Sequence, residues 1–522
     1  MPATNLWTRA KSPGMLSLGL VKLAECTGEG DFGVDAGDAH SVLDDPAFLK
    51  AITVIKRRAE QQQDPEKIVD VFVQTDLPSR CDTEDTQLIL GRRGTGKTHL
   101  IRYVEKVNEQ AGQPFRYCDC RMLGSGLQDD RSTGLAVGAK YFRALARDFT
   151  NFLMDRTVLL ERPPQGLQDR VVNKLTQLTS VLDQQDSQNR SKFDYAAFHD
   201  CLSGVFGDLG YKRVTLVLDE WAAVPPIGQP YLAEFLKRAL LTVPNLTLKV
   251  LAVNYQCRFA DSIEGNPVGM QRGADFVDVI DLDGYLVFEE NRTFVEQFFG
   301  QLLYNHLGAE MKWDLSAAPE QKVAGSRSLF TQDKAFTELV RAAEGNARDL
   351  MCIFSRAYFD SYRKKSTRTR GISVNDVYQA ASTWYETEKE SNIKGDPDPQ
   401  KTLSYLMDNV LKGYKSRTFL VEKPKAEHRC ILRLLNERVL HRLNETYSHP
   451  DRPGLRYEIF TLDYGAYVRY RGTKDDPDRP VFLFEDDLLS MSHNDMEFMV
   501  PLDDKRSIRR IVFDPDAMSV QV

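Results

Sequence analysis

The chain has 522 residues, of which 42% are hydrophobic and 27% charged, a composition typical of globular proteins with buried cores. Its length predicts about three or four domains. Because the formal net charge is −7, the protein as a whole does not attract nucleic acid, and any contact with DNA requires a local basic patch.

The eight cysteines form no CxxC pair, and the CxC at Cys118 and Cys120 is a weak metal signal. We therefore expect free thiols in a reducing cytoplasm. Residues 1–14 lack the apolar region of a signal peptide, and no run of about 18 apolar residues occurs. These features predict a cytoplasmic protein without membrane-spanning segments.

Residues 1–84 are expected to form an N-terminal arm and a helical lead-in. Residues 1–45 are rich in Gly, Asp and Ser and carry no sustained periodicity, whereas a helical pattern runs through residues 47–63. Residues 68–73, IVDVFV, fit either a short strand or a further helical turn.

Residues 85–285 alternate apolar strands with helices, and a long helical insertion is expected at about 121–211. Continuous apolar strands indicate burial on both faces, so the pattern predicts an α/β fold with a parallel sheet between helices. The expected strands are TQLIL (86–90), FRYCDC (115–120), RVTLVLDE (213–220), TLKVLAVN (247–254) and FVDVIDL (276–282).

Residues 286–390 predict an all-helical lid, and residues 401–522 a small winged-helix-like α+β domain. The four helices expected in the lid span 291–307, 334–345, 347–365 and 374–390, and a turn-rich linker follows at 391–400. In the last domain, a helix at 426–443 precedes short strands at 455–463, 466–472, 480–486 and 508–514.

Residues 91–98, GRRGTGKT, match the phosphate-loop pattern GxxxxGK[ST] in full, between an apolar strand and an amphipathic helix. Glycines let successive backbone N–H groups face an anion at a helix N-terminus. Lys97 adds a positive charge for the β- and γ-phosphates, and Thr98 offers its hydroxyl to Mg²⁺. The residues expected to contact ATP are Gly91, Arg92, Arg93, Gly94, Thr95, Gly96, Lys97, Thr98 and His99.

Asp219 and Glu220 end a buried strand, which delivers them to the sheet edge where the phosphates bind. There Asp219 is expected to hold Mg²⁺, and Glu220 to orient and deprotonate the attacking water. The 122-residue separation of Lys97 and Asp219 leaves room for an intervening strand. This arrangement favours the additional-strand class of P-loop ATPases over a kinase or GTPase layout.

Three further polar residues are candidates for sensing or stabilising the γ-phosphate. Asn254 ends a strand, with Arg258 as a weaker candidate for the same task. Arg272 precedes the fifth strand, from which it could reach the nucleotide of a neighbouring subunit. Arg348, in the sequence GNARD, opens a lid helix and could swing over a triphosphate.

The order of these motifs resembles that of AAA+ ATPases. The resemblance implies that they are Walker A, Walker B, sensor one (Asn254), arginine finger (Arg272) and sensor two (Arg348). It covers about 85–390 well and 401–522 loosely, where it is similar to the origin-recognition and Cdc6-like branch. The long segment between the second and third strands departs from a compact core, and in this respect the chain also resembles STAND-type ATPases.

A DNA contact through the C-terminal domain is one possible partner interaction, and a protein effector or a homo-oligomer are others. Residues 401–442 carry ten basic and four acidic residues, whereas residues 443–522 carry ten and sixteen, including the acidic runs at 475–478 and 485–487. Along the expected helix, arginines at i,i+4 spacing lie opposite an apolar stripe. These are Arg429, Arg433, Arg438 and Arg442.

The function favoured by the sequence is an ATP- and Mg²⁺-dependent molecular switch that hydrolyses ATP and transmits its nucleotide state to DNA or a protein partner. A STAND-like signalling or defence ATPase and a DNA-remodelling motor are the alternatives. The intact pair Asp219 and Glu220 argues against a third possibility, a scaffold protein that binds ATP without hydrolysing it.

Overall fold

The computed structural model describes residues 42–55, 65–124, 133–160, 164–187, 193–263, 265–364, 371–448, 453–471 and 511–519. Most of the expected N-terminal arm, the strand expected at 480–486 and both acidic runs lie outside these residues.

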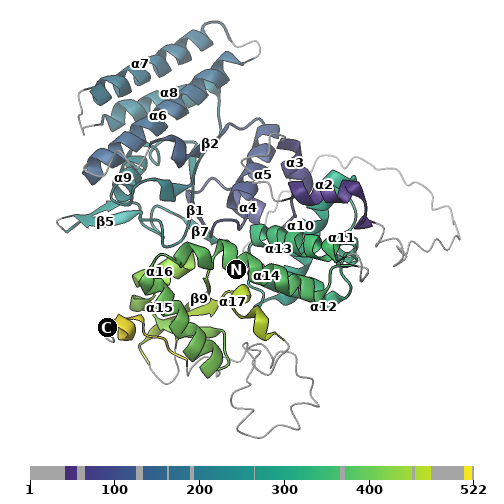
Figure 1. The fold of residues 1–522 in the computed structure, drawn as a ribbon. Helices are drawn as coiled ribbons and strands as arrows, with labels where there is room; N and C mark the ends of the chain where they lie inside the picture. Colours follow the sequence, from purple (N-terminus) through teal and green to yellow (C-terminus); the bar gives the residue numbers. More distant parts are fainter. Residues whose placement is uncertain are drawn as a thin grey trace, which may run out of the picture.

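A five-stranded parallel sheet forms the centre of the first half of the chain (Figure 1). Its order is β2 (Phe115–Asp119), β3 (Val214–Asp219), β4 (Leu246–Ala252), β1 (Gln87–Leu90) and β7 (Asp278–Asp281). Every neighbouring pair is parallel. Because β4 lies between β1 and β3, the sheet has the additional strand that the sequence predicts.

The inner strands β1, β3 and β4 are buried almost throughout, because helices cover both faces of the sheet. In β3, Leu216 and Leu218 belong to one buried cluster and Val217 to another, as the alternation of side chains along a strand requires. The first cluster includes side chains of α6 (Gly134–Val158) and α9 (Gln229–Ala239), and the second includes those of α4 (Leu77–Cys81) and α5 (Lys97–Gln110). The prediction of a parallel sheet between helices is confirmed.

The segment between β2 and β3 projects from the sheet as three helices (Figure 1). These are α6, α7 (Leu167–Ser187) and α8 (Tyr195–Leu209). The structure also contains an antiparallel hairpin between β4 and β7, formed by β5 (Ala260–Ile263) and β6 (Asn266–Gly269). The sequence did not predict it, because its short strands are largely exposed and mix polar with apolar residues.

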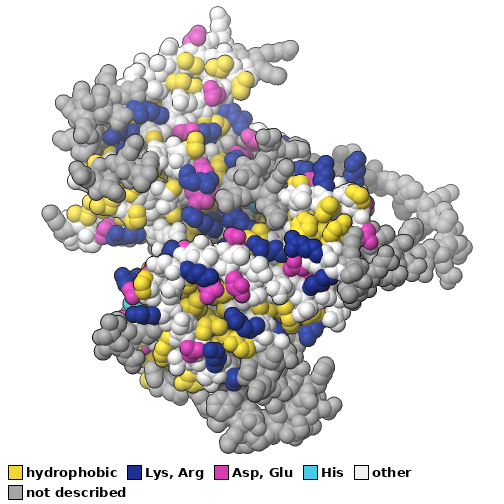
Figure 2. Space-filling view, viewed as in Figure 1, with side chains coloured by type: hydrophobic (Ala, Val, Ile, Leu, Met, Phe, Trp, Pro, Cys, Tyr) yellow, Lys and Arg dark blue, Asp and Glu magenta, His cyan; other side chains and the backbone are white. Residues whose placement is uncertain are grey.

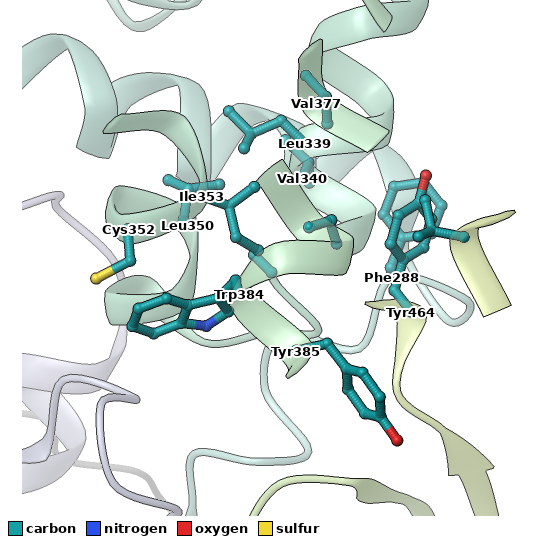
Figure 3. Close-up of a cluster of buried hydrophobic side chains, with 14 of the residues drawn as sticks. Phe288, Leu339, Val340, Leu350, Cys352, Ile353, Val377, Trp384, Tyr385 and Tyr464 are labelled. Carbon is teal, nitrogen blue, oxygen red and sulfur yellow. The ribbon is translucent and has the colours of Figure 1, made fainter. Parts of the chain in front are cut away.

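The described residues of the lid form five α-helices, one more than the sequence predicts. They are α10 (Arg292–Met311), α11 (Pro319–Arg327), α12 (Asp333–Ala342), α13 (Ala347–Arg363) and α14 (Val374–Glu388). Figure 3 shows how side chains of α12, α13 and α14, among them Leu339, Ile353 and Val377, gather in the lid core. The N-terminal α2 (Pro46–Val54) packs against α10, and α3 (Pro65–Val71) against α5. The ambiguous residues 68–73 therefore begin as helix.

The C-terminal part combines short helices with an antiparallel sheet of order β8 (Thr418–Glu422), β10 (Arg456–Leu462) and β9 (Leu440–Ser448). Its helices are α15 (Pro397–Tyr405), α16 (Arg429–Asn436) and α17 (Tyr464–Tyr467), with a π-helical turn at Leu406–Gly413. This agrees with the prediction of a small α+β domain.

Three local predictions in this part were wrong. The helix expected to reach residue 443 ends at Asn436, because Arg438 adopts a left-handed conformation (φ 61°) and the chain then pairs with β10. The strand expected at 466–472 is instead the end of α17 followed by a 3₁₀ turn at Val468–Tyr470. The expected linker 391–400 contains the start of α15.

The lid and the C-terminal part share one hydrophobic core, to which α2 also contributes, whereas the sheet has separate clusters. Figure 3 shows Tyr464 of the C-terminal part at the edge of the lid core, near Phe288. Buried ion pairs join the same two parts, including Arg417 with Glu344 and Arg471 with Glu338. We call residues of the lid and the C-terminal part together the lid body.

Candidate nucleotide-binding site

The phosphate loop is shaped by two glycines in the left-handed region. Gly94 has φ 95° and Gly96 has φ 99°, conformations that other residues adopt only under strain. A Cβ on Gly94 would lie 2.5 Å from Oδ1 of Asn346, so the lid also excludes any larger residue there. Helix α5 begins directly after Gly96, which leaves its first N–H groups available to an anion.

Lys97 folds back across this loop. Its Nζ donates to the carbonyl oxygens of Gly91 (2.5 Å) and Arg92 (3.1 Å). Burial lowers the pKa of the Lys97 ammonium, and the charges of Asp283 and Asp219 act in the opposite direction. The lysine is thus held by oxygen acceptors at the place where the loop curls.

Asp219 and Thr98 meet at the carboxyl edge of the sheet. The hydroxyls of Thr98 and Tyr117 both donate to Oδ2 of Asp219 at 2.7 Å, and Oδ1 accepts from the backbone N–H of Glu220 at 2.7 Å. Hard oxygen atoms of this kind suit Mg²⁺, which is held by one or two protein groups with water and phosphate completing its shell. The residues present therefore fit the expected metal.

Glu220 leaves the strand in a left-handed conformation (φ 54°). Its side chain borders the same cavity as Lys97, Thr98 and Asp219. A carboxylate beside the phosphate-loop lysine is placed to accept a proton from a water molecule in that cavity.

This cavity has a volume of about 280 Å³ and combines charged and apolar walls. Apolar residues that border it include Ile55 at the end of α2, Leu302 of α10 and Met351 of α13. His99 and His306 also border it, with their rings in edge contact. Burial lowers the pKa of His99 and lowers that of His306 to about 3, so both imidazoles are neutral near pH 7.

Arg348 borders the cavity from the lid, as the sequence predicts for a lid residue near the phosphates. Its backbone N–H donates to the carbonyl of Gly94 at 3.2 Å. The side chain of Asn346 caps α13 and donates through Nδ2 to the carbonyl of Arg93 at 2.8 Å. These two hydrogen bonds join the start of α13 in the lid to the phosphate loop.

Asn254 and Arg272 lie outside the cavity that Lys97 and Glu220 border. Asn254 instead borders a second cavity of about 250 Å³, which shares Arg93 and Val253 with the first. Its Nδ2 is buried and has no hydrogen-bond partner among the described residues. Arg272 is exposed, close to Cys257, and borders neither of these two cavities.

Arg92 ties the phosphate loop to the lid body through a chain of buried polar groups. Its guanidinium binds Asp283 (3.0 Å), the carbonyl of Glu344 (2.9 Å) and Nδ1 of His441 on β9. Nε2 of His441 contacts Asp463 at 2.7 Å. Asp463 then pairs with Lys389, as does Asp349 at the start of α13. We call Arg92, His441, Asp463, Lys389 and Asp349 the polar relay.

A second contact joins β9 to the sheet. Arg442 pairs with Asp281 at the end of β7 (3.0 Å) and donates to the hydroxyl of Tyr255 (2.8 Å). The Tyr255 hydroxyl donates in turn to Glu458 of β10 at 2.8 Å. Tyr255 directly follows Asn254, so the lid body also holds the loop that carries this candidate sensor.

The sequence analysis missed four residues of this region, namely Tyr117, Arg121, His306 and His441. Tyr117 and Arg121 belong to the second predicted strand and the turn after it, so the sheet edge alone could have indicated them. His306 and His441 carry no local signal, because their partners lie far away in the sequence.

The described cysteines are all free, as expected, and no helix in the described part of the chain is long and apolar enough to cross a membrane.

No protein-family model matches the sequence, and a comparison with curated proteins finds no match. Among solved structures, the chain is similar to the RuvB Holliday junction branch migration motor of Thermotoga maritima, at 11% identity over 78% of this chain and 94% of that one, with a TM-score of 0.31. It is also similar to the Aeropyrum pernix ORC1 protein in complex with DNA, at 13% identity over 80% and 96% of the two chains, with a TM-score of 0.31.

The strand order of the sheet and the helical lid after it agree with the order of motifs in the sequence. Because of this strand order, this lid and these motifs, the chain has the fold of an additional-strand P-loop ATPase of the AAA+ type.

Proposed function

We propose that this protein is an ATP-binding and ATP-hydrolysing molecular switch, in which the nucleotide sets the contact between the phosphate loop and the lid body. The observation that supports the proposal is that residues of the lid body contact the phosphate loop directly. Asn346, Arg348 and His441 bind loop residues Arg93, Gly94 and Arg92, respectively.

We infer that the triphosphate of ATP lies in the cavity bordered by Lys97 and Glu220. The adenine base of ATP would then lie among the apolar residues and the two neutral histidines. Phosphate oxygens replace the carbonyls that Lys97 contacts. Thr98 and Asp219 would hold Mg²⁺, which would neutralise charge on the β- and γ-phosphates. Glu220 takes the proton of the attacking water.

Binding of the triphosphate then requires Lys97 to leave the carbonyls of Gly91 and Arg92, which changes the loop that the lid body holds. A ligand shifts a conformational equilibrium only by binding its two states with different affinity. The contacts of Arg92 and Asn346 provide such a difference, because they depend on the conformation of the same loop.

The partner of the switch is proposed to be a protein effector rather than DNA bound by the four arginines. Arg438 and Arg442 pair with Asp349 and Asp281, and their side chains are only 16% and 10% exposed. Arg429 and Arg433 also have acidic partners, Asp398 and Glu437. On the face drawn in Figure 2, coloured basic side chains lie among acidic and apolar ones rather than in one continuous patch.

The proposal is tested with purified protein by measuring ATP affinity and steady-state hydrolysis. We expect Lys97→Ala to lose ATP binding or turnover, and Glu220→Gln to bind ATP without hydrolysing it. Hydrogen exchange of β9 in Glu220→Gln should differ between ATP and ADP. Unchanged turnover in Glu220→Gln would refute the assigned base, and identical exchange with both nucleotides would refute the switch.

The same assays separate the alternatives. A DNA-remodelling motor would show fast turnover that DNA stimulates, whereas a STAND-like switch would show slow turnover without such stimulation. Arg272, which is exposed, keeps its proposed role as a finger only if the protein assembles with Arg272 of one copy at the cavity of another.

A further inference from the structure

A short turn after β2 brings an unassigned arginine to the nucleotide cavity. β2 and β3 run parallel with Asp119 opposite Asp219, so the residues that follow both strands emerge at the same edge of the sheet. Arg121 lies in the 3₁₀ turn Cys120–Met122, which packs against the turn Trp221–Ala223 that follows Glu220. The Arg121 side chain borders the same cavity as Lys97 and Glu220.

The Arg121 guanidinium is held by a carboxylate in a geometry that a phosphate can adopt. Its Nε contacts both oxygens of Asp119, at 2.9 and 3.0 Å, and Nη2 contacts Oδ2 at 2.5 Å. Such a forked pair suits phosphate as well as carboxylate. Because the Arg121 side chain is 45% exposed, ligand oxygens in the cavity can reach the guanidinium.

The backbone of the turn is held by its own hydrogen bond. Asp119 caps the turn by accepting from the backbone N–H of Arg121 at 2.9 Å. The exchange of Asp119 for phosphate that we propose below leaves this backbone hydrogen bond intact.

Arg272 is the arginine finger predicted from the sequence, but it does not lie near the nucleotide cavity of its own chain. It is exposed and borders neither of the two cavities described. Of the other arginines that border the nucleotide cavity, Arg93 belongs to the phosphate loop and Arg348 to the lid. Arg121 comes from the turn beside Glu220.

We propose that Arg121 is a catalytic residue that acts in cis, a role that rests on the proposed ATPase function. When ATP is bound, the guanidinium exchanges Asp119 for oxygens of the γ-phosphate. Water then attacks the γ-phosphorus and gives its proton to Glu220, while the bond to the bridging oxygen breaks and its electron pair remains on ADP. Arg121 donates hydrogen bonds to the transferring group and gains or loses no proton.

The test compares Arg121→Ala, Arg121→Lys and Arg272→Ala with a matched control, Arg363→Ala. Arg363, at the end of α13, is likewise an exposed arginine paired with an aspartate close in sequence, Asp360, and it borders neither cavity. ATP affinity, steady-state turnover and thermal unfolding are measured for each protein, and turnover per chain is measured over a wide range of protein concentration.

Arginines that stabilise phosphoryl transfer contribute about 10³–10⁵-fold to kcat. Since Arg121 is partly exposed, we expect its alanine variant to lose about 100-fold in kcat, with ATP affinity within about threefold of wild type. Lysine should not restore the rate, because it lacks the planar fork. Arg363→Ala and Arg272→Ala should turn over ATP normally, and wild-type turnover per chain should not depend on concentration.

Two results would overturn the role of Arg121. One is turnover in Arg121→Ala within twofold of wild type, and the other is turnover that rises with protein concentration and disappears in Arg272→Ala. A structural role would lower thermal stability in Arg121→Ala but be repaired by lysine, which keeps the charge beside Asp119. Absence of hydrolysis by the wild type would instead reject the proposed ATPase function itself.

Discussion

Replacement of Lys389 by methionine tests whether the polar relay holds the lid body together. The Lys389 ammonium lies 2.6 Å from Asp463 and 2.9 Å from Asp349, and all three side chains are at most 2% exposed. Burial by itself raises the pKa of both carboxyls, but pairing with Lys389 outweighs it and holds the pKa of each below its usual range. Methionine keeps the length of the side chain and removes its charge.

Breaking a buried ion pair from one side costs about 3–5 kcal/mol, because the remaining charge is left without compensation. Since each carboxylate is favoured over its protonated form in the folded state, this stabilisation is present above about pH 4 and is lost as the pH falls below that value. In Lys389→Met, Asp349 keeps Arg438 and Asp463 keeps His441 as a partner. At neutral pH we therefore expect the lid body to lose stability at the lower end of this range, about 3 kcal/mol, and the difference from wild type to shrink in acid.

Hydrogen exchange is the suitable assay, because the chain contains separate cores and local stability can be measured segment by segment. Amides of α13, α14 and β9 should lose protection in Lys389→Met, while those of β3 and β4 serve as an internal reference. The matched control is Lys412→Met, whose pair with Asp408 is more than half exposed on both sides and contributes little to stability. Equal protection in the two variants would refute the reasoning.

Three other outcomes are expected. Gly94→Ala should abolish ATP binding without unfolding the sheet, because φ is 95° and the added Cβ meets Asn346, as measured by nucleotide titration beside circular dichroism. His306→Leu should flatten the acid dependence of stability: the folded pKa of about 3 lies below the unfolded value of about 6.5, so wild-type stability falls as pH drops through that window, and denaturant unfolding at several pH values measures the difference. Arg417→Met should destabilise the lid body, because it removes the hydrogen bond that the Arg417 guanidinium donates to the buried carboxyl group of Glu344, and hydrogen exchange of β8 reports the loss.

The sheet and the phosphate loop could be predicted because their signals are local. The inner strands β1, β3 and β4 are mostly apolar, and the loop has a fixed spacing of glycines before Lys97. These two features depend on neighbours in the sequence. The contact of Thr98 with Asp219 is a tertiary one, but it could be expected because both residues lie at the carboxyl edge of the parallel sheet.

The segment around Arg438 shows why the rest could not be predicted. Residues 426–443 have the apolar spacing of a helix, yet the chain leaves the helix after Asn436 and becomes the strand β9. The competing interaction is pairing with β10, whose partner residues lie some distance along the chain. As a result Arg442 pairs with Asp281, and Arg438 with Asp349, instead of lining one exposed helical face.

Asn254 shows the same limit within the site. Its position after β4 was correctly identified as a strand end, but its side chain borders the cavity beside the one that contains Lys97. The next residue, Tyr255, is left-handed (φ 63°) and is held by Arg442 of the lid body. The orientation of a loop residue thus depends on a contact with a distant part of the chain, which no local pattern reveals.

The contacts of Arg92 determine whether a conformational change in the phosphate loop affects the lid body. Because the lid and the C-terminal part share one hydrophobic core and several buried ion pairs, they are expected to move together rather than separately. The contacts of this body with the loop, by contrast, are a small number of hydrogen bonds and ion pairs, each worth about 0.5–3 kcal/mol. A triphosphate that rearranges the loop can therefore compete with them, whereas it cannot dismantle the lid core. By reciprocity, any partner that pulls β9 away from Arg92 must change the affinity for the nucleotide by the same factor by which the nucleotide changes the affinity for that partner.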